Sequence, residues 1–234
     1  MTISLDDYFR PVAETPRDDE GNPDFESLEA LDVPLLNDAL VRLMRNEEVE
    51  TPTFDFHTGT RKPAGKKMKL PDRAILILEG IHGLNDALTP LVERPRKHKI
   101  YVSALTQLNL DDHNRIATTD NRLVRRMVRD SQFRGHTAQT TLSMWPSVRR
   151  GEDRNIFPFQ NTADSAFNSA LDYELAVLKV YAEPLLASVK PDVQEYQEAR
   201  ALLGFLGNFA PLLPRWVPPT SILREFIGES AFKY

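Results

Sequence analysis

Two acidic residues directly follow β-prone stretches of the sequence and could act together. Asp6 follows residues 2–5, and Glu79 follows the apolar run 74–78. In open α/β sheets, ligands bind at the carboxyl ends of the strands. Mg²⁺ takes oxygen ligands from one or two carboxylates together with substrate phosphates and water. The pair therefore predicts a magnesium site with a proton acceptor beside it, and the alternative is that each carboxylate only caps a turn.

A group of basic side chains recurs at helical spacing later in the chain. The group comprises Arg122, Arg125, Arg126, Arg129, Arg134 and His136. The first four follow an i, i+3, i+4, i+7 pattern that places them on one stripe of a helix. Guanidinium groups match phosphate bidentately and stabilise charge during phosphoryl transfer. The stripe predicts a phosphate-bearing ligand, and a solvated face with scattered ion pairs is the alternative.

A polar loop over residues 55–61 combines an aromatic ring, hydroxyl groups and the imidazole of His57. Such a loop could contact a small molecule. A solvated histidine with no function is the alternative.

The positioning elements follow from apolar periodicity. Residues 2–5 predict a strand, residues 27–46 a helix in two pieces divided near Pro34, and residues 49–56 with 68–70 a hairpin arm. The runs 74–78 and 99–104 predict strands buried on both faces of a parallel sheet. Helices are expected over 112–130, 163–186 and 193–209. Strands that alternate with helices indicate an α/β protein.

Composition limits the classes of protein that remain. The 234 residues are 41% hydrophobic and 27% charged, with no cysteine, which excludes disulfides, thiolate zinc sites and a cysteine nucleophile. No apolar run approaches the ~20 residues of a membrane span, and no secretory signal pattern is present. We therefore expect a cytoplasmic protein without a membrane partner. The net charge of −5 and the lack of aromatic residues among the arginines argue against a nucleic-acid partner.

Five segments in this order resemble the uridine kinase and phosphoribulokinase family of P-loop kinases, in its bacterial uridine kinase-like branch. They are residues 4–10, 23–26, 54–57, 78–82 and 122–130. The resemblance implies a P-loop NTPase-like parallel sheet flanked by helices, with a helical lid at about 122–155. It also implies a core over residues 1–190 and a helical, proline-rich extension over 191–234 that packs on the core.

The resemblance also implies roles for individual residues. Asp6 would be the general base and would bind Mg²⁺ together with Glu79. Asp24 and Arg126 would hold the ribose hydroxyls of a nucleoside or sugar substrate. The nucleobase would lie near Phe54 and His57, and the lid residues that close over the phosphates of ATP would be Arg129, Arg134 and His136.

The sequence contains no G-x-x-x-x-G-K-[ST] phosphate loop, which a P-loop kinase needs to hold its nucleotide. We therefore expect the first strand, the phosphate loop and the first helix of the family fold to be missing from this chain. The expected function is that of a nucleoside kinase-like protein that binds ATP poorly by itself. A non-catalytic remnant that serves as a binding or interaction module is the alternative. Sheet edges left open by a missing strand would favour a homo-oligomer.

Overall fold

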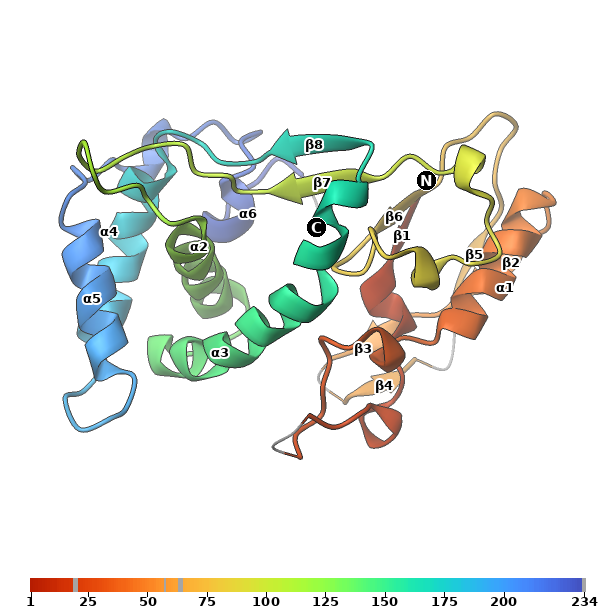
Figure 1. Cartoon of the computed structure of the whole chain (residues 1–234), viewed down its shortest axis with the longest axis horizontal. Coiled ribbons are helices and arrows are strands. Elements are labelled where there is room, and N and C mark those ends of the chain that lie inside the picture. Colours follow the sequence, from red (N-terminus) through yellow and green to blue (C-terminus); the bar gives the residue numbers. More distant parts are fainter. Residues whose placement is uncertain (19–20, 57, 63–64, 233–234) are drawn as a thin grey trace. The chain divides into compact units, whose positions relative to one another are not determined.

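A computed structural model describes residues 1–18, 21–56, 58–62 and 65–232 (Figure 1). The chain divides into two compact units. The first unit comprises Met1–Tyr101 and Val148–Ser165, and the second comprises Val102–Ser147 and Ala166–Tyr234. The mixture of helices with a parallel strand pair confirms the predicted α/β class. The boundary near residue 190 stays a prediction.

The first unit contains a parallel pair of strands, β1 (Thr2–Ser4) and β6 (Ile77–Glu79). Their register places Thr2 opposite Ile77 and Ser4 opposite Glu79. The prediction that residues 74–78 are buried on both faces is wrong, because Ile75 is 76% exposed and Ile77 is 54% exposed. Among the described residues, β1 is the one strand that pairs with β6, so part of this apolar strand stays uncovered.

The same discrepancy occurs in the second predicted strand, residues 99–104. It forms β7 (Ile100–Ser103), which pairs with β8 (Ser165–Asn168). Ile100 and Val102 point the same way in the pleat and are both more than half exposed. In both predicted strands one face is thus exposed, and the other is partly or fully buried.

The predicted helix over residues 27–46 does form in two pieces. A 3₁₀ turn covers Leu28–Ala30, and helix α1 covers Val33–Met44. Pro34 lies in the first turn of α1, where its missing N–H costs nothing. The Asp32 carboxylate accepts a hydrogen bond from the Leu35 N–H at 3.1 Å and caps the helix.

Two short antiparallel pairs complete the strands of the first unit. β2 (Val49–Thr51) pairs with β5 (Lys66–Met68), so a hairpin arm forms as predicted, although its first strand is shorter than residues 49–56 and its second begins two residues before 68–70. β3 (Phe54–Asp55) pairs with β4 (Thr60–Arg61). The core beneath these elements is formed by buried side chains of β1, of the 3₁₀ helix Leu5–Tyr8 that follows it, and of α1, β2 and β3. Among them are Ile3, Leu5, Tyr8, Leu36, Leu40, Leu43, Val49 and Phe54.

The second unit is mainly helical. Its helices are α2 (Thr118–Phe133), α4 (Glu174–Ala187), α5 (Tyr196–Leu206) and α6 (Arg224–Ile227). Helix α3 (Ala138–Asn155) contributes residues to both units. The predicted helix over 193–209 is confirmed by α5, although it is shorter at both ends.

Two predicted helices have the wrong start. The helix expected from residue 112 begins at Thr118, because the Asp111 carboxylate accepts the N–H groups of His113 and Asn114 and holds a turn there. The helix expected from residue 163 begins at Glu174, because residues 165–168 form β8 instead. In both cases hydrogen bonds outside the helix replace those that helical backbone would make.

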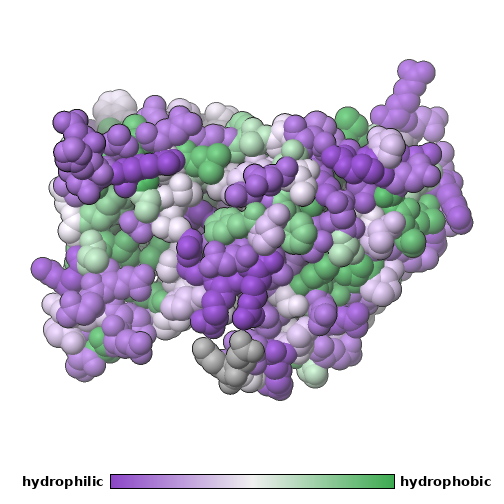
Figure 2. All heavy atoms as spheres, in the orientation of Figure 1, coloured by the Kyte–Doolittle hydropathy of each residue, from purple (hydrophilic) through white to green (hydrophobic). Residues whose placement is uncertain are grey.

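None of the helices in the described part of the chain combines the length and apolar character needed to cross a bilayer. Apolar residues nevertheless reach the surface in several patches among charged ones (Figure 2).

Candidate functional site

The predicted acidic pair lies at the ends of the parallel strands. The register of β1 and β6 aligns Ser4 with Glu79, and Asp6 follows two residues later in the first turn of a 3₁₀ helix, Leu5–Tyr8. The side chains of Asp6 and Glu79 are both exposed. The strand pairing therefore brings the two carboxylates to the same end of the pair.

Gly80 allows the close approach of the two chain segments that follow these strands. Its φ is +150°, and a Cβ on it would lie 2.7 Å from the Leu5 Cβ. Any side chain at this position would push the segment after β6 away from the turn that carries Asp6.

Phe54, the residue expected beside a nucleobase, is tied directly to the acidic turn. Its N–H donates to Asp7 Oδ1 at 3.1 Å. Arg61 donates to the carbonyls of Phe9 at 3.1 Å and Tyr8 at 3.3 Å. Both strands of the β3–β4 pair therefore hydrogen-bond to the segment that follows Asp6.

Phe54 belongs to a cluster of four phenylalanine rings, together with Phe9, Phe25 and Phe56. The ring centroids of Phe9 and Phe54 are 5.8 Å apart, those of Phe9 and Phe25 are 5.6 Å apart, and those of Phe54 and Phe56 are 5.1 Å apart. Phe9 and Phe54 are buried, whereas Phe25 and Phe56 are 36% and 64% exposed. The buried pair thus supports two exposed rings, which could stack against a flat apolar ligand. His57, predicted beside this cluster, lies outside the described residues.

Asp24, the predicted ribose contact, is half-buried beside Phe25 in sequence. Its Oδ1 accepts the N–H of Glu26 at 3.1 Å, and its own N–H donates to the Pro16 carbonyl at 2.7 Å. These bonds fix the carboxylate relative to its own backbone.

His82 is a buried residue near Asp24 that was not predicted from the sequence as a site residue. Its side chain is 1% exposed, and among the described residues neither ring nitrogen meets hydrogen-bond geometry. Burial lowers the pKa of His82, and the Ser27 backbone and the Asp24 carboxylate oppose that shift. Burial therefore disfavours the protonated form of His82 in the folded first unit.

We expect the stability of the first unit to fall as the pH drops below about 6.5, the ordinary pKa of histidine. The unfolded chain then binds a proton that the folded His82 resists, so stability is fully present above that pH and declines below it. The slope for one proton is at most about 1.4 kcal/mol per pH unit. Urea unfolding followed by circular dichroism at pH 7.5 and 5.5 measures it. His82→Leu should reduce the pH dependence, and His98→Leu, which removes an exposed histidine of the same unit, is the comparison. Equal slopes in wild type and His82→Leu would contradict the prediction.

The second unit gathers the predicted phosphate-binding side chains around one carboxylate, Asp130, which is fully buried. The distances to its oxygens are 3.3 Å from Arg126 Nε, 3.6 Å from Arg129 Nε, 3.3 Å from Arg134 Nη1 and 3.8 Å from His136 Nδ1. Three guanidinium groups therefore lie within 3.6 Å of one carboxylate. Among the described residues the Nε atoms of Arg126 and Arg129 have no hydrogen-bond partner. We call these five residues the Asp130 cluster.

The Asp130 cluster has the chemistry of an anion site. Burial, followed by repulsion from Arg134, lowers the pKa of the Arg129 guanidinium. An incoming phosphate would relieve that repulsion and satisfy donors that are now unpaired. Asp130 was not predicted as a site residue, although its i, i+4 spacing from both Arg126 and Arg134 could have revealed it.

Arg125 does not belong to the phosphate-binding stripe that the spacing suggested. It is buried, and its guanidinium binds Glu174 and the Ser169 carbonyl. Two acids therefore compensate part of the stripe, namely Glu174 beside Arg125 and Asp130 beside Arg126.

The donor set at the strand ends fits a magnesium ion. Asp6 and Glu79 offer carboxylate oxygens, and their exposure leaves room for the waters that Mg²⁺ retains. Among the described residues no group of three or more His, Cys, Asp or Glu side chains could hold a metal. The protein could thus supply the two carboxylates, while substrate phosphates and water would supply the other ligands.

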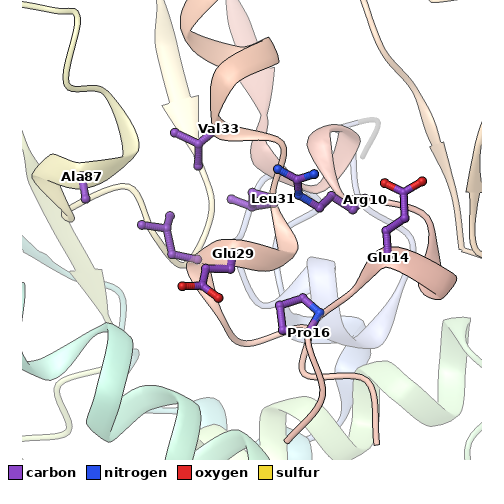
Figure 3. Close-up of a pocket in the computed structure, with 8 residues that line it drawn as sticks. Arg10, Glu14, Pro16, Glu29, Leu31, Val33 and Ala87 are labelled. Carbon is purple, nitrogen blue, oxygen red and sulfur yellow. The ribbon is translucent and has the colours of Figure 1, made fainter.

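A shallow, open hollow of about 550 Å³ lies elsewhere in the first unit (Figure 3). It is lined by charged side chains, including Arg10, Glu14 and Glu29, and by apolar ones such as Leu31 and Val33. None of the predicted site residues lines it.

The sequence matches the model of the phosphoribulokinase / uridine kinase family over residues 2–176. It is 30% identical over 148 residues to the uridine kinase of Clostridium botulinum (strain Langeland), a match that covers 63% of each chain. It is 26% identical over 194 residues, or 82% of each chain, to the uridine kinase of Alkaliphilus metalliredigens. The match to the Clostridium protein therefore spans less than two thirds of that relative. Since the family match covers most of the sequence, the chain belongs to the phosphoribulokinase / uridine kinase family.

Proposed function

We propose that this chain is the acceptor-binding part of a nucleoside kinase that transfers the γ-phosphoryl group of ATP to a sugar hydroxyl. The observation that carries the proposal is the bond between the Phe54 N–H and Asp7 Oδ1. It joins the turn that carries Asp6 to the phenylalanine cluster. A nucleoside presents a flat base and a hydroxyl-bearing sugar, and these two features match an aromatic surface beside a carboxylate.

The proposed roles follow the chemistry of each group. Asp6 accepts the proton of the attacking hydroxyl and binds Mg²⁺ together with Glu79. Asp24 binds ribose hydroxyls, and the base lies against the cluster around Phe54, whereas the ribose contact that the resemblance implies for Arg126 stays a prediction. The phosphates of ATP bind the cationic side chains of the Asp130 cluster, namely Arg129, Arg134 and His136. When bound, Mg²⁺ would neutralise the charge on the transferred phosphoryl group.

The exposed side of β6 supports a second part of the proposal. Full burial of one isoleucine is worth about 1.5–3 kcal/mol, and both Ile75 and Ile77 lack most of it. We propose that a further strand, which carries the phosphate loop and lies outside these 234 residues, packs against this apolar strand. Calorimetric titration of the chain with Mg–ATP tests this, because tight binding by the chain alone would overturn it.

The acceptor role predicts that the chain binds uridine and discriminates it from 2′,3′-dideoxyuridine. Hydrogen bonds to a charged group contribute about 1.5–3 kcal/mol each, so the loss of both hydroxyls should weaken binding at least tenfold. Asp24→Asn should remove most of that difference. Isothermal titration calorimetry measures both affinities, and Asp38→Asn, an exposed acid on α1, is the matched control.

Three results separate the alternatives. If the chain binds no nucleoside, the proposed function is wrong. If both nucleosides bind equally, the role of Asp24 is wrong. The chain would be a non-catalytic binding module under a third result. In that case it discriminates between the two nucleosides, but Asp6→Asn has no effect on turnover when a phosphate loop is supplied.

A further inference from the structure

The last turn of α3 hydrogen-bonds to the segment that carries Asp24. Asn155 Nδ2 donates to the Glu26 carbonyl at 2.7 Å. The Glu26 N–H in turn donates to Asp24 Oδ1 at 3.1 Å. Only one residue therefore separates the Asn155 amide from the Asp24 carboxylate, and all three residues belong to the first unit.

Gly151 supports the same segment one helical turn earlier. It lies four residues before Asn155, so both positions share one face of α3. A Cβ on Gly151 would lie 2.6 Å from the Glu26 Cβ and 2.7 Å from its Cγ. Cβ atoms do not approach that closely, and the Glu26 Cβ is rigidly attached to the backbone. The segment can therefore reach its place against α3 only because residue 151 has no side chain.

We propose that Asn155 and Gly151 are positioning residues that set the Asp24 carboxylate for a ribose hydroxyl. The proposal rests on the proposed function, because it needs Asp24 to contact the acceptor. Asn155 holds the carbonyl of Glu26, and the N–H of the same residue, in the preceding peptide group, holds Oδ1 of Asp24. The orientation of Oδ2 toward a ligand is thereby set as well. Neither α3 residue contacts the acceptor in this scheme.

Amide hydrogen exchange by NMR tests the contact without any ligand. Asn155→Ala removes the donor to the Glu26 carbonyl, and we expect the Glu26 amide to exchange roughly tenfold faster, while the amides of α1 keep their protection. The matched control is Asn208→Ala, which also removes an asparagine that donates to main-chain carbonyls, Gly204 and Phe205. Unchanged exchange at Glu26 in Asn155→Ala would overturn the proposal.

The ribose dependence of binding separates positioning from a merely structural role. Asn155→Ala should weaken uridine binding about threefold to tenfold, the range for one neutral hydrogen bond, and leave 2′,3′-dideoxyuridine affinity unchanged. In an Asp24→Asn background, Asn155→Ala should have no further effect on the ratio of the two affinities. A wild-type ratio in Asn155→Ala would overturn this inference alone. Absence of uridine binding by the wild type would overturn the proposed function and the inference with it.

A glycine pair provides a second, independent variant. Gly151→Ala should weaken uridine binding selectively in the same way, because the new methyl group displaces Glu26. The control is Gly204→Ala in α5, where a Cβ meets nothing within 4 Å. Both changes raise helix propensity, so a difference in nucleoside binding reports the contact with Glu26. Equal uridine affinities in the two variants would count against the role of Gly151.

Discussion

Glu174→Ala is expected to lower the free energy of unfolding of the second unit by about 3–5 kcal/mol, because it leaves a buried arginine without its counter-charge. The Glu174 carboxylate is 1% exposed and accepts from Arg125 Nε at 2.8 Å. It also accepts from the amide of Asn121, which is fully buried. Removal of the carboxylate therefore leaves the Arg125 guanidinium and the Asn121 amide without this acceptor in a buried site.

The measurement can be confined to the second unit. Both tryptophans of the protein, Trp145 and Trp216, belong to it, so their fluorescence in urea reports its unfolding alone. The matched control is Glu183→Ala on the same helix, which removes a 40% exposed partner of Lys179. We expect that control to cost less than about 1 kcal/mol.

An apolar replacement of both partners distinguishes charge from packing. Arg125→Met with Glu174→Leu should recover most of the lost stability, because no unpaired charge remains. A loss below about 1 kcal/mol in Glu174→Ala, similar to that of the Glu183 control, would show that the buried pair does not behave as described.

The contrast between Arg125 and its neighbours shows what the sequence could and could not predict. Helical spacing placed four arginines on one stripe, and α2 does form there. Spacing carries no information about a partner 49 residues away, so the pairing of Arg125 with Glu174 was invisible. By contrast, the same helical spacing could have predicted the local partner Asp130, which lies four residues after Arg126.

For the strands, the position along the sequence could be predicted, but the burial of their side chains could not. The position of the acidic pair was predictable, because Asp6 and Glu79 each follow a short β-prone stretch, and β1 pairs with β6 in parallel. Burial was not predictable, because it depends on what packs against the strand. An unbroken apolar run indicates only that such a strand can be covered on both faces.

The two misplaced helix starts have a common physical cause. The expected helices included residues 112–117 and 163–173, but local propensity is weak compared with specific hydrogen bonds. The Asp111 carboxylate holds the first segment in a turn, and pairing with β7 draws the second into a strand. The positioning bond from Asn155 to Glu26 was equally hidden, since it joins residues 129 apart in sequence.

Asp6→Asn is expected to reduce phosphoryl transfer from ATP to a nucleoside about 10²- to 10⁴-fold in kcat, the usual contribution of a general base. The measurement requires the chain together with a phosphate-loop segment, and it follows nucleoside monophosphate formation at saturating uridine. Asparagine keeps the size of the side chain but cannot accept the hydroxyl proton. The KM for uridine should therefore change little.

The neighbouring residue provides the control that separates chemistry from architecture. Asp7→Asn retains an oxygen that can accept the Phe54 N–H, the bond that ties the acidic turn to the phenylalanine cluster. Its kcat should stay within about tenfold of wild type, since at most one hydrogen bond weakens. If Asp7→Asn loses as much activity as Asp6→Asn, with unchanged folding, Asp6 is not the base. If neither substitution affects turnover, the hydroxyl is deprotonated without help from this turn, and the mechanism proposed for the site is wrong.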